Sequence, residues 1–333
     1  MNSITAVRHR FSQKAATLFL AAFCNVALSN EARAAHAVPI ESSKLHVVFV
    51  DNDAYQPQHR AGYNGVAELR LASSTQPNLF VPPYSGLNLE HFFSGDAASF
   101  AWDIFEPRRA PMELRRTANR RVELRQERTE HWPIRSRLVY EVKGDAIDLT
   151  YRGTPLQDVW NKHGYIGVFF ASYIQAPEDM AIQFIGRSRP GRGDSTPRWI
   201  KHVPQSHGHA ANHRPAGSTW DPSFDQGFKI PLAAGFSDFE YVYPFYFGRS
   251  GENVVVFMFE KPRDGGEMRF AQSPSGGGTG NPAWDFMYFR RDYTVGREFR
   301  FQVRTVYRKF TSVEDVVRLY ERWSGVSVHR PPN

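Results

Sequence analysis

The sequence of 333 residues contains one cysteine, Cys24, which lies near the N-terminus inside an apolar segment. Downstream of it the chain has no thiol that could act as a nucleophile or form an internal disulfide bond. Thiol catalysis and disulfide stabilisation are therefore excluded for that part of the chain. Its stability has to come from its apolar core, which 41% hydrophobic residues are ample to build.

Lysine is also scarce, since 33 of the basic residues are arginine and only eight are lysine. Arginine binds carboxylate, sulfate and phosphate through two parallel hydrogen bonds, which favours an anionic ligand. No nucleic-acid-binding motif is recognisable, so we expect no nucleic-acid partner. The apolar runs at 15–28 and 165–174 are shorter than the roughly 20 residues of a membrane-spanning helix, so we expect no membrane span.

The first 35 residues have the pattern of a secretory signal peptide. A basic start precedes the apolar run 15–28, and Ala32-Arg33-Ala34 forms a small-x-small cleavage signal. Lipid attachment at Cys24 is the weaker alternative because the bulky Phe23 precedes it. Removing residues 1–35 takes away four basic residues and one acidic residue, which lowers the net charge from +7 to about +4. We expect the mature protein to be secreted or periplasmic.

Short apolar segments separated by glycine- and proline-rich turns fill the remaining chain, which is typical of β-sheet. Hairpins are expected from the arms 112–116 and 121–128 and from the arms 137–142 and 146–151. The run 165–174 is a strand or a short helix, because periodicity does not distinguish the two. Further strands are expected at 44–50, 65–71, 100–105, 181–185, 239–243, 245–247, 254–260, 268–271, 285–289 and 297–307.

About fourteen strands in all predict an all-β fold, a large antiparallel β-sandwich with a cleft on one curved face. One helix is predicted at the C-terminus, where Thr311-x-x-Glu314 forms a capping box and Gly325 is a stop signal. We expect residues 36–326 to form a single domain and 327–333 to be a loose tail.

Four histidines stand in the segment 202–222, which glycine and proline predict to be a loop. His207, His209 and His213 are candidate ligands for a divalent metal, with Asp221 as a carboxylate ligand; no other cofactor is indicated. Alternatively, His207 or His209 acts as a general acid or base. The third alternative is a polar surface loop without a catalytic role.

Tyrosine and arginine gather in the segment 241–249, where Tyr243 and Tyr246 stand near Arg249. Such a pair suits removal of a proton beside a carboxylate, because arginine neutralises the acid and tyrosine exchanges the proton. Half-buried aromatic residues of an ordinary strand are the alternative.

The stretch 108–137 contains ten arginines and four glutamates. It is either an electropositive wall or a solvated β-face with cross-strand Arg–Glu pairs. Arg108 and Arg109 lie in a proline-flanked loop, which makes them the better candidates for a specific anion contact.

Tryptophans are candidates for stacking on sugar rings, and each is equally compatible with the core. Trp284 precedes Asp285, which would anchor hydroxyl groups; Trp220, Trp199 and Trp102 are further candidates. Carboxylate candidates of equal weight are Glu90-His91 and Asp103/Glu106. The Gly-x-Ser-x-Gly and His-Glu-x-x-His motifs are both absent, so the sequence carries neither signature.

The segment 122–152 contains several sequence features that occur together, in this order, in one known family. Thr129 and Trp132-Pro133 form a turn, and Tyr140–Val142 leads into Gly144-Asp145 and then Ile147. This segment resembles the galactose-mutarotase-like supersandwich.

The resemblance implies a sugar-binding cleft in a protein that epimerises sugars, cleaves polysaccharides by elimination, or binds glycans. Epimerase members use a mid-chain histidine as acid and a late glutamate as base, and His207 or His209 matches the first by position. For the second, Glu260 and Glu267 are the candidates. We therefore expect a secreted glycan-active enzyme, first a lyase on uronate glycans that uses Tyr and His. A sugar epimerase, a glycoside hydrolase and a non-catalytic glycan-binding protein are the alternatives.

Overall fold

The computed structural model describes residues 36–55, 63–73, 76–101, 104–262 and 265–331. The expected signal peptide, Trp102 and Asp103 lie outside these residues. The strands are β1 (Ala37–Glu41), β2 (Leu45–Val50), β3 (Gly65–Leu71), β4 (Asn88–Phe93), β5 (Glu113–Ala118), β6 (Arg121–Gln126), β7 (Ile134–Lys143), β8 (Ala146–Pro155), β9 (Tyr165–Ala171), β10 (Ile182–Ser188), β11 (Arg198–His202), β12 (Asn212–Pro215), β13 (Phe236–Tyr241), β14 (Phe245–Ser250), β15 (Asn253–Phe259), β16 (Gly266–Ser273), β17 (Ala283–Arg291) and β18 (Phe299–Lys309), and the helices are η1 (Ala97–Ala101), α2 (Glu106–Arg109), α3 (Pro231–Ala234) and α4 (Val313–Ser324).

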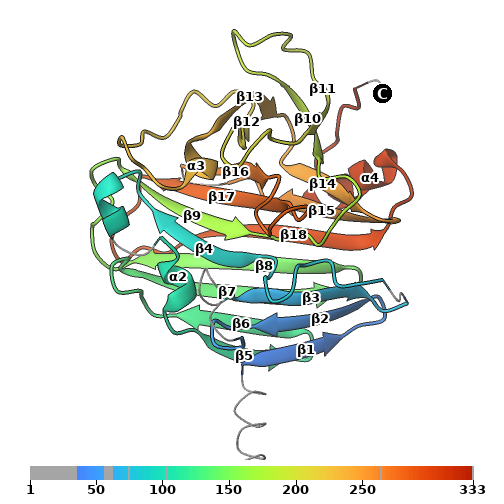
Figure 1. Cartoon of the computed structure of the whole chain (residues 1–333), viewed down its shortest axis with the longest axis horizontal. Coiled ribbons are helices and arrows are strands. Elements are labelled where there is room, and N and C mark those ends of the chain that lie inside the picture. The colour runs from blue at the N-terminus through green and yellow to red at the C-terminus, as the bar shows by residue number, and fades with distance from the viewer. Residues whose placement is uncertain (1–35, 56–62, 74–75, 102–103, 263–264, 332–333) are drawn as a thin grey trace, which may run out of the picture.

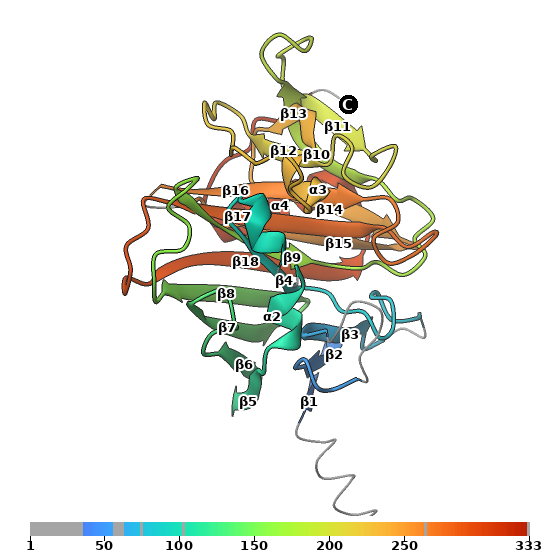
Figure 2. The same cartoon turned by 60° about the vertical axis from the view of Figure 1, so that its left-hand side comes forward.

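The strands form a two-layered sandwich, which confirms the predicted fold class (Figures 1 and 2). One long sheet runs in the order β4-β9-β17-β16-β12-β13-β10-β14-β15-β18-β8-β7-β6-β5 and folds back on itself. We call β4, β9, β17, β16 and β12 the front layer and β5 to β8, β18, β15 and β14 the back layer. A separate sheet, β1-β2-β3, continues the front layer through a bridge between Val66 and Gly86.

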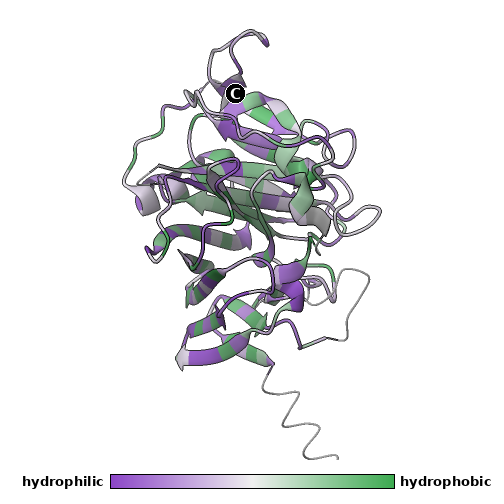
Figure 3. Ribbon diagram, turned by 90° about the vertical axis from the view of Figure 1, so that its left-hand side faces the viewer, coloured by the Kyte–Doolittle hydropathy of each residue, from purple (hydrophilic) through white to green (hydrophobic). Residues whose placement is uncertain are grey.

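The main core lies between the two layers. Phe286 of the front layer packs on Phe259 of the back layer at a ring-centroid distance of 5.2 Å, and Phe49 of β2 lies 5.1 Å from Tyr140 of β7. Hydropathy alternates along several strands in Figure 3, as expected where one strand face is buried and the other wet.

The strands β9 and β17 do not alternate in this way, because both of their faces are buried. One face contributes to the core between the layers, and the other is covered by the loop 216–235 and by residues near η1 and α2. A strand buried on both faces has a continuous apolar sequence. This explains why the run 165–174 had no readable period, and the structure identifies it as a strand.

Helix α4 covers the outer face of the back layer through Val316, Val317 and Tyr320. Its N-cap is Ser312, whose hydroxyl accepts a hydrogen bond from the Asp315 amide, so the predicted cap at Thr311 is wrong by one residue. Gly325 ends the helix in the left-handed conformation, at φ 72°, as predicted.

Replacing Ser312 by alanine is expected to lower the free energy of unfolding by about 1 kcal/mol, because the first helical turn loses its side-chain acceptor. Urea unfolding measures the change. The neighbouring exposed Thr311→Ala is the control, with an expected change below about 0.5 kcal/mol; equal effects of both variants would argue against the Ser312 cap.

Other sequence expectations need correction. The segment 100–105 is not a strand in its described part, because residues 100 and 101 belong to η1 and residues 104 and 105 form a turn before α2. The histidine loop contains a short strand, β12, which pairs in parallel with β13. The tail is anchored as far as it is described: Val328 is buried, and the amides of Val328 and His329 donate to Glu321 and to the Tyr243 hydroxyl. Among the described residues, no helix is long and apolar enough to cross a bilayer.

Candidate active site

A cavity of about 240 Å³ lies on the outer face of the front layer, where β4, the end of β9 and the start of β17 meet. We call it the Glu90 cavity. The loop 203–210 and helix α3 close it on the other side, with apolar residues at 230–232. Its polar lining comes from six residues: Glu90, His91, Tyr173, His207, Lys229 and Asp285.

Glu90 forms the centre of this lining. Its carboxylate accepts a hydrogen bond of 2.5 Å from the Tyr173 hydroxyl and lies 3.1 Å from His91 Nε2 and 3.4 Å from Arg108. A register shift in β4 between Leu89 and His91 allows these consecutive residues to share one face of the sheet. Glu90 is 5% exposed, so its charge needs these partners.

The surroundings of Glu90 keep it ionised. Burial works to raise its pKa, but the positive charges of His91 and Arg108 and the hydrogen bonds from His91 and Tyr173 outweigh burial and lower the pKa to about 2. Burial, with the Glu90 charge beside it, raises the pKa of Tyr173 well above its ordinary value. At neutral pH the pair therefore consists of a carboxylate and an intact phenol.

Both ring nitrogens of His91 face oxygen acceptors. Its Nε2 lies beside the Glu90 carboxylate, and its Nδ1 lies 2.5 Å from the carbonyl oxygen of Ile104. Both nitrogens are therefore engaged within the protein, and the ring is held against Glu90.

His207 reaches the cavity because of the glycine that follows it. Gly208 has φ 80°, and a Cβ at this position would lie 2.4 Å from Pro231 of α3, so only glycine allows the loop to approach the helix this closely. The Nδ1 of His207 is 3.0 Å from the Ser273 hydroxyl, which fixes the orientation of the ring. His207 is exposed, at the mouth of the cavity.

Asp285 lies at the start of β17 with its side chain in the cavity lining. It is 1% exposed, and its Oδ1 accepts a hydrogen bond of 2.8 Å from the Ser172 amide. The cavity thus holds a second carboxylate, on a different strand from Glu90.

A larger hollow of about 660 Å³ contains two of the predicted sugar-binding residues, Trp220 and Tyr243. We call it the Trp220 groove. Lys261, Glu267 and Arg291 also line it, and the Arg291 guanidinium lies 4.9 Å from the centre of a Trp220 ring. Aromatic faces next to charged groups are a suitable surface for an anionic sugar.

The expected meeting of His207, His209, Tyr246 and Arg249 in one cleft is not found. Tyr246 is buried between the layers and donates to the Asp285 carbonyl at 3.1 Å. Arg249 lies at the β14–β15 hairpin, bonded to backbone carbonyls and 3.9 Å from the centre of the Phe310 ring. His209 is exposed but does not line the cavity.

Trp284 is a core residue rather than a stacking platform. It is fully buried, its Nε1 donates to the Met180 carbonyl at 3.0 Å, and its ring packs against Gly248, where a Cβ would lie 2.2 Å from it. Trp199 packs on Phe245 and Phe247 in the cluster on the outer face of the back layer.

The three candidate metal ligands His207, His209 and His213 do not converge. His213 is fully buried, with its ring centre 4.8 Å from Phe184 and 4.7 Å from His202. Burial, together with His202, lowers its pKa well below the ordinary value, so it is neutral. In the described part of the chain, the one group with metal-ligand spacing is His36, Asp51 and Asp53. Asp221 instead pairs with three arginines, Arg189, Arg214 and Arg269.

Arg108 lies in helix α2 and not in a loop, and it contacts a carboxylate of its own chain. It is fully buried and lies 3.7 Å from the centre of the Tyr63 ring. Its guanidinium places a positive charge beside the Glu90 carboxylate. Arg109 is exposed and does not line the cavity. The arginine-rich stretch 108–137 contains Arg–Glu pairs, as expected for a solvated β-face, because the Glu123 carboxylate pairs with Arg125 and Arg137.

Tyr173 is the residue that the sequence analysis missed. It stands in the apolar run 165–174, where nothing separates a core tyrosine from one that faces a cavity. The sequence offered Glu90-His91 and Asp103/Glu106 as equal candidates. The pairing of β4 with β9 places Glu90 and His91 in the cavity, which favours the first.

Comparison with solved structures finds chains that align with most of this one at low identity. A galactose mutarotase-like protein from Lactobacillus casei aligns with 82% of this chain and 100% of its own, at 8% identity and a TM-score of 0.47. An α-N-acetylgalactosaminidase from Bifidobacterium bifidum aligns with 86% of this chain and 38% of its own, at 10% identity and a TM-score of 0.43. A heparan sulfate lyase mutant from Pedobacter heparinus aligns with 84% and 37%, at 10% identity and a TM-score of 0.38.

The structural neighbours thus include the galactose mutarotase-like proteins that the segment 122–152 resembles. No family model matches the sequence, and no curated protein matches it significantly.

Proposed function

We propose that the protein is a carbohydrate-active enzyme that performs acid–base chemistry on an acidic glycan in the Glu90 cavity. One observation carries the proposal: an ionised carboxylate, a phenol and two histidines line one small cavity. Clustered ionisable groups with strongly shifted pKa values in a cavity are typical of catalytic sites.

The charges around the cavity favour an anionic sugar. His91 and Lys229 line the cavity, and Arg108 lies behind the Glu90 carboxylate. Basic side chains of this kind suit a substrate that brings its own carboxylate, such as a uronate. The Trp220 groove supports the same class of ligand.

The proton-transfer roles follow from what each group can still do. Glu90 has too low a pKa to act as a general acid near neutral pH, and His91 has both nitrogens engaged. Asp285 accepts a hydrogen bond from the Ser172 amide, and we assign the proton transfers to Tyr173 and His207. In an elimination, His207 takes the proton beside the sugar carboxylate, and Tyr173, whose raised pKa keeps it a phenol, protonates the departing glycosidic oxygen.

Ultraviolet absorbance during incubation with a panel of uronate polysaccharides tests the reaction type. Elimination creates a double bond conjugated to the carboxylate, so ultraviolet absorbance rises as product forms. If absorbance stays flat across the panel while the protein is folded, elimination is refuted. Reducing-end and anomeric assays on the same panel then separate hydrolysis from epimerisation.

Replacing His207 by alanine is expected to lower turnover at least about tenfold with an unchanged melting temperature, because the residue is exposed and lines the cavity. The control is His209→Ala, which removes an exposed imidazole two residues away that does not line it. Equal turnover in the two variants would remove His207 from the mechanism.

Glycan binding without catalysis is the second candidate function, favoured by the size and aromatic lining of the Trp220 groove. Calorimetry of uronate oligosaccharides with Trp220→Ala distinguishes it: binding that depends on Trp220, with no product formed, identifies a binding protein. Export of the mature chain remains part of the proposal, and N-terminal sequencing of the natural protein tests cleavage after Ala34 or Ala35.

A further inference from the structure

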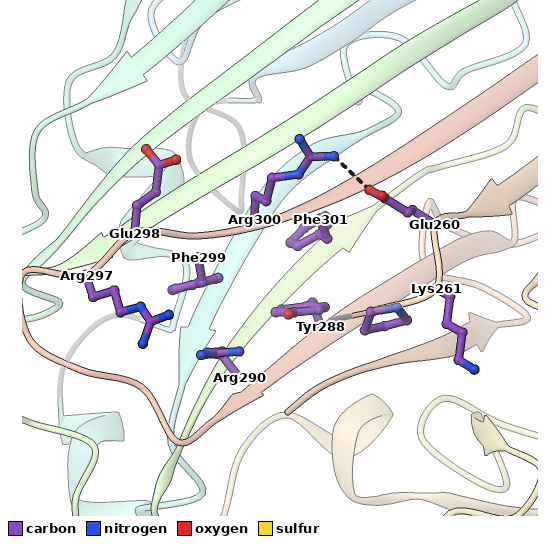
Figure 4. A pocket seen from close by; sticks show the side chains of 10 residues that line it. Glu260, Lys261, Tyr288, Arg290, Arg297, Glu298, Phe299, Arg300 and Phe301 are labelled. Atoms are coloured by element: carbon purple, nitrogen blue, oxygen red, sulfur yellow. Dashed lines mark hydrogen bonds and ion pairs between the residues drawn. The ribbon is translucent and has the colours of Figure 1, made fainter. Parts of the chain in front are cut away.

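A second pocket of about 240 Å³ opens between the two layers, where β15 and β17 end and β18 begins. We call it the Arg290 pocket. It lies on the opposite face of β17 from the Glu90 cavity, because Tyr288 and Arg290 alternate with Asp285 and Met287 along the strand. Aromatic side chains form its floor, with the Tyr288 and Phe299 rings stacked at 12° (Figure 4).

Four basic and two acidic side chains line this pocket: Lys261, Arg290, Arg297, Arg300, Glu260 and Glu298. Each of the two acids is already paired with a cation other than Arg290 and Arg297. Glu260 accepts a hydrogen bond of 2.9 Å from Arg300, and Glu298 pairs with Arg152, which lies outside the pocket. In Figure 4 the Glu298 carboxylate points away from Arg290 and Arg297.

Arg290 and Arg297 form no ion pair with any acid in the described residues. Arg290 is 7% exposed, its Nε has no hydrogen-bond partner there, and its one hydrogen bond is a long one, 3.5 Å, to the Asp292 carbonyl. Arg297 is exposed, and its side chain extends toward Arg290 in Figure 4. A nearly buried guanidinium without a counter-charge is costly, and a second cation beside it increases that cost.

We propose that the Arg290 pocket binds a sulfate or phosphate group, either as a free ion or as a substituent of a glycan. Two guanidinium groups match the double charge of a tetrahedral oxyanion, whose oxygens accept parallel hydrogen bonds from more than one side. Arg290 is the nearly buried member of this pair, and Arg297 is the exposed one. The site does not depend on chemistry in the Glu90 cavity.

Calorimetric titration of the full-length protein with sodium sulfate and sodium phosphate tests the site, against sodium chloride at constant ionic strength. We expect saturable binding of the oxyanions that chloride does not reproduce, with a parallel rise in melting temperature. Arg297→Gln should bind at least about tenfold more weakly, because a charge-assisted hydrogen bond is lost. Arg297 is exposed, so this variant is expected to fold. Arg290→Gln changes a nearly buried side chain, and it serves as a second binding variant where its melting curve shows that it is folded.

Arg120→Gln is the matched control, since it removes one exposed guanidinium at the β5–β6 turn, outside the pocket, and leaves the net charge equal to that of Arg297→Gln. A sulfated and an unsulfated oligosaccharide of the same length identify the source of the group. Binding of free sulfate supports an ion site, and binding of the sulfated oligosaccharide alone supports a glycan substituent. Absence of saturable binding for every probe, or equal affinities of the Arg297 and Arg120 variants, would overturn the proposal.

Discussion

Replacing Tyr173 by phenylalanine is expected to lower turnover on the glycan substrate at least about a hundredfold, which is the usual scale for loss of a proton-transferring group. The Tyr173 hydroxyl is the phenol in the lining of the Glu90 cavity and is held by the Glu90 carboxylate at 2.5 Å. Phenylalanine keeps the ring and its contacts with Tyr63 and Tyr84 but has no proton to exchange. Steady-state kinetics on the substrate found in the polysaccharide screen measures the effect.

Tyr165→Phe is the matched control for this variant. Tyr165 is a buried tyrosine of the same strand face, and its hydroxyl donates to the Ser223 carbonyl at 2.9 Å instead of facing the cavity. Tyr165→Phe loses a hydrogen bond to a neutral carbonyl, about 1 kcal/mol of stability, and Tyr173→Phe loses one to a carboxylate, about 1.5 to 3 kcal/mol. A catalytic role requires that Tyr173→Phe alone loses turnover; retention of activity within about threefold of wild type would exclude proton transfer by Tyr173.

The fold was predictable because its signals are local. Hairpins at 112–128 and 137–151 show alternating apolar residues and turn residues within one short window, and the structure contains both. The run 165–174 carried no period because β9 is covered on both faces, which depends on segments far away in the sequence. The cap of α4 was missed by one residue, since Thr311 and Ser312 are adjacent and both are residue types that cap helices.

The candidate site was only partly predictable, because it depends on strand neighbours and on strand faces. Glu90 and Tyr173 are 83 residues apart and meet because β4 pairs with β9. Trp284 and Asp285 are consecutive, yet one enters the core and the other faces the cavity. The sequence does not tell which of two alternating faces is which, so a stacking tryptophan and a core tryptophan look alike.

The second large effect is on stability. Glu90→Gln is expected to lower the free energy of unfolding at pH 7 by about 3 kcal/mol. The carboxylate is buried among His91, Arg108 and Tyr173, and the variant leaves the two cations without a counter-charge. A pKa lowered from 4.5 to about 2 corresponds to a stabilisation of that order at neutral pH. Urea unfolding followed by tryptophan fluorescence measures the difference between wild type and variant.

The pH dependence of that difference separates the charge of Glu90 from its shape. Because the pKa of Glu90 is depressed in the folded state, its stabilisation is complete above about pH 4.5 and is lost as the pH falls toward 2. The gap between wild type and Glu90→Gln should therefore be constant from pH 7 to about 5 and shrink steadily below that. Glu298→Gln, which breaks an exposed pair with Arg152, should change stability by less than about 1 kcal/mol at any pH. A gap that persists unchanged at pH 2.5 would mean that glutamine disturbs the packing of the cavity, and that the Glu90 charge does not hold His91 and Arg108 in place.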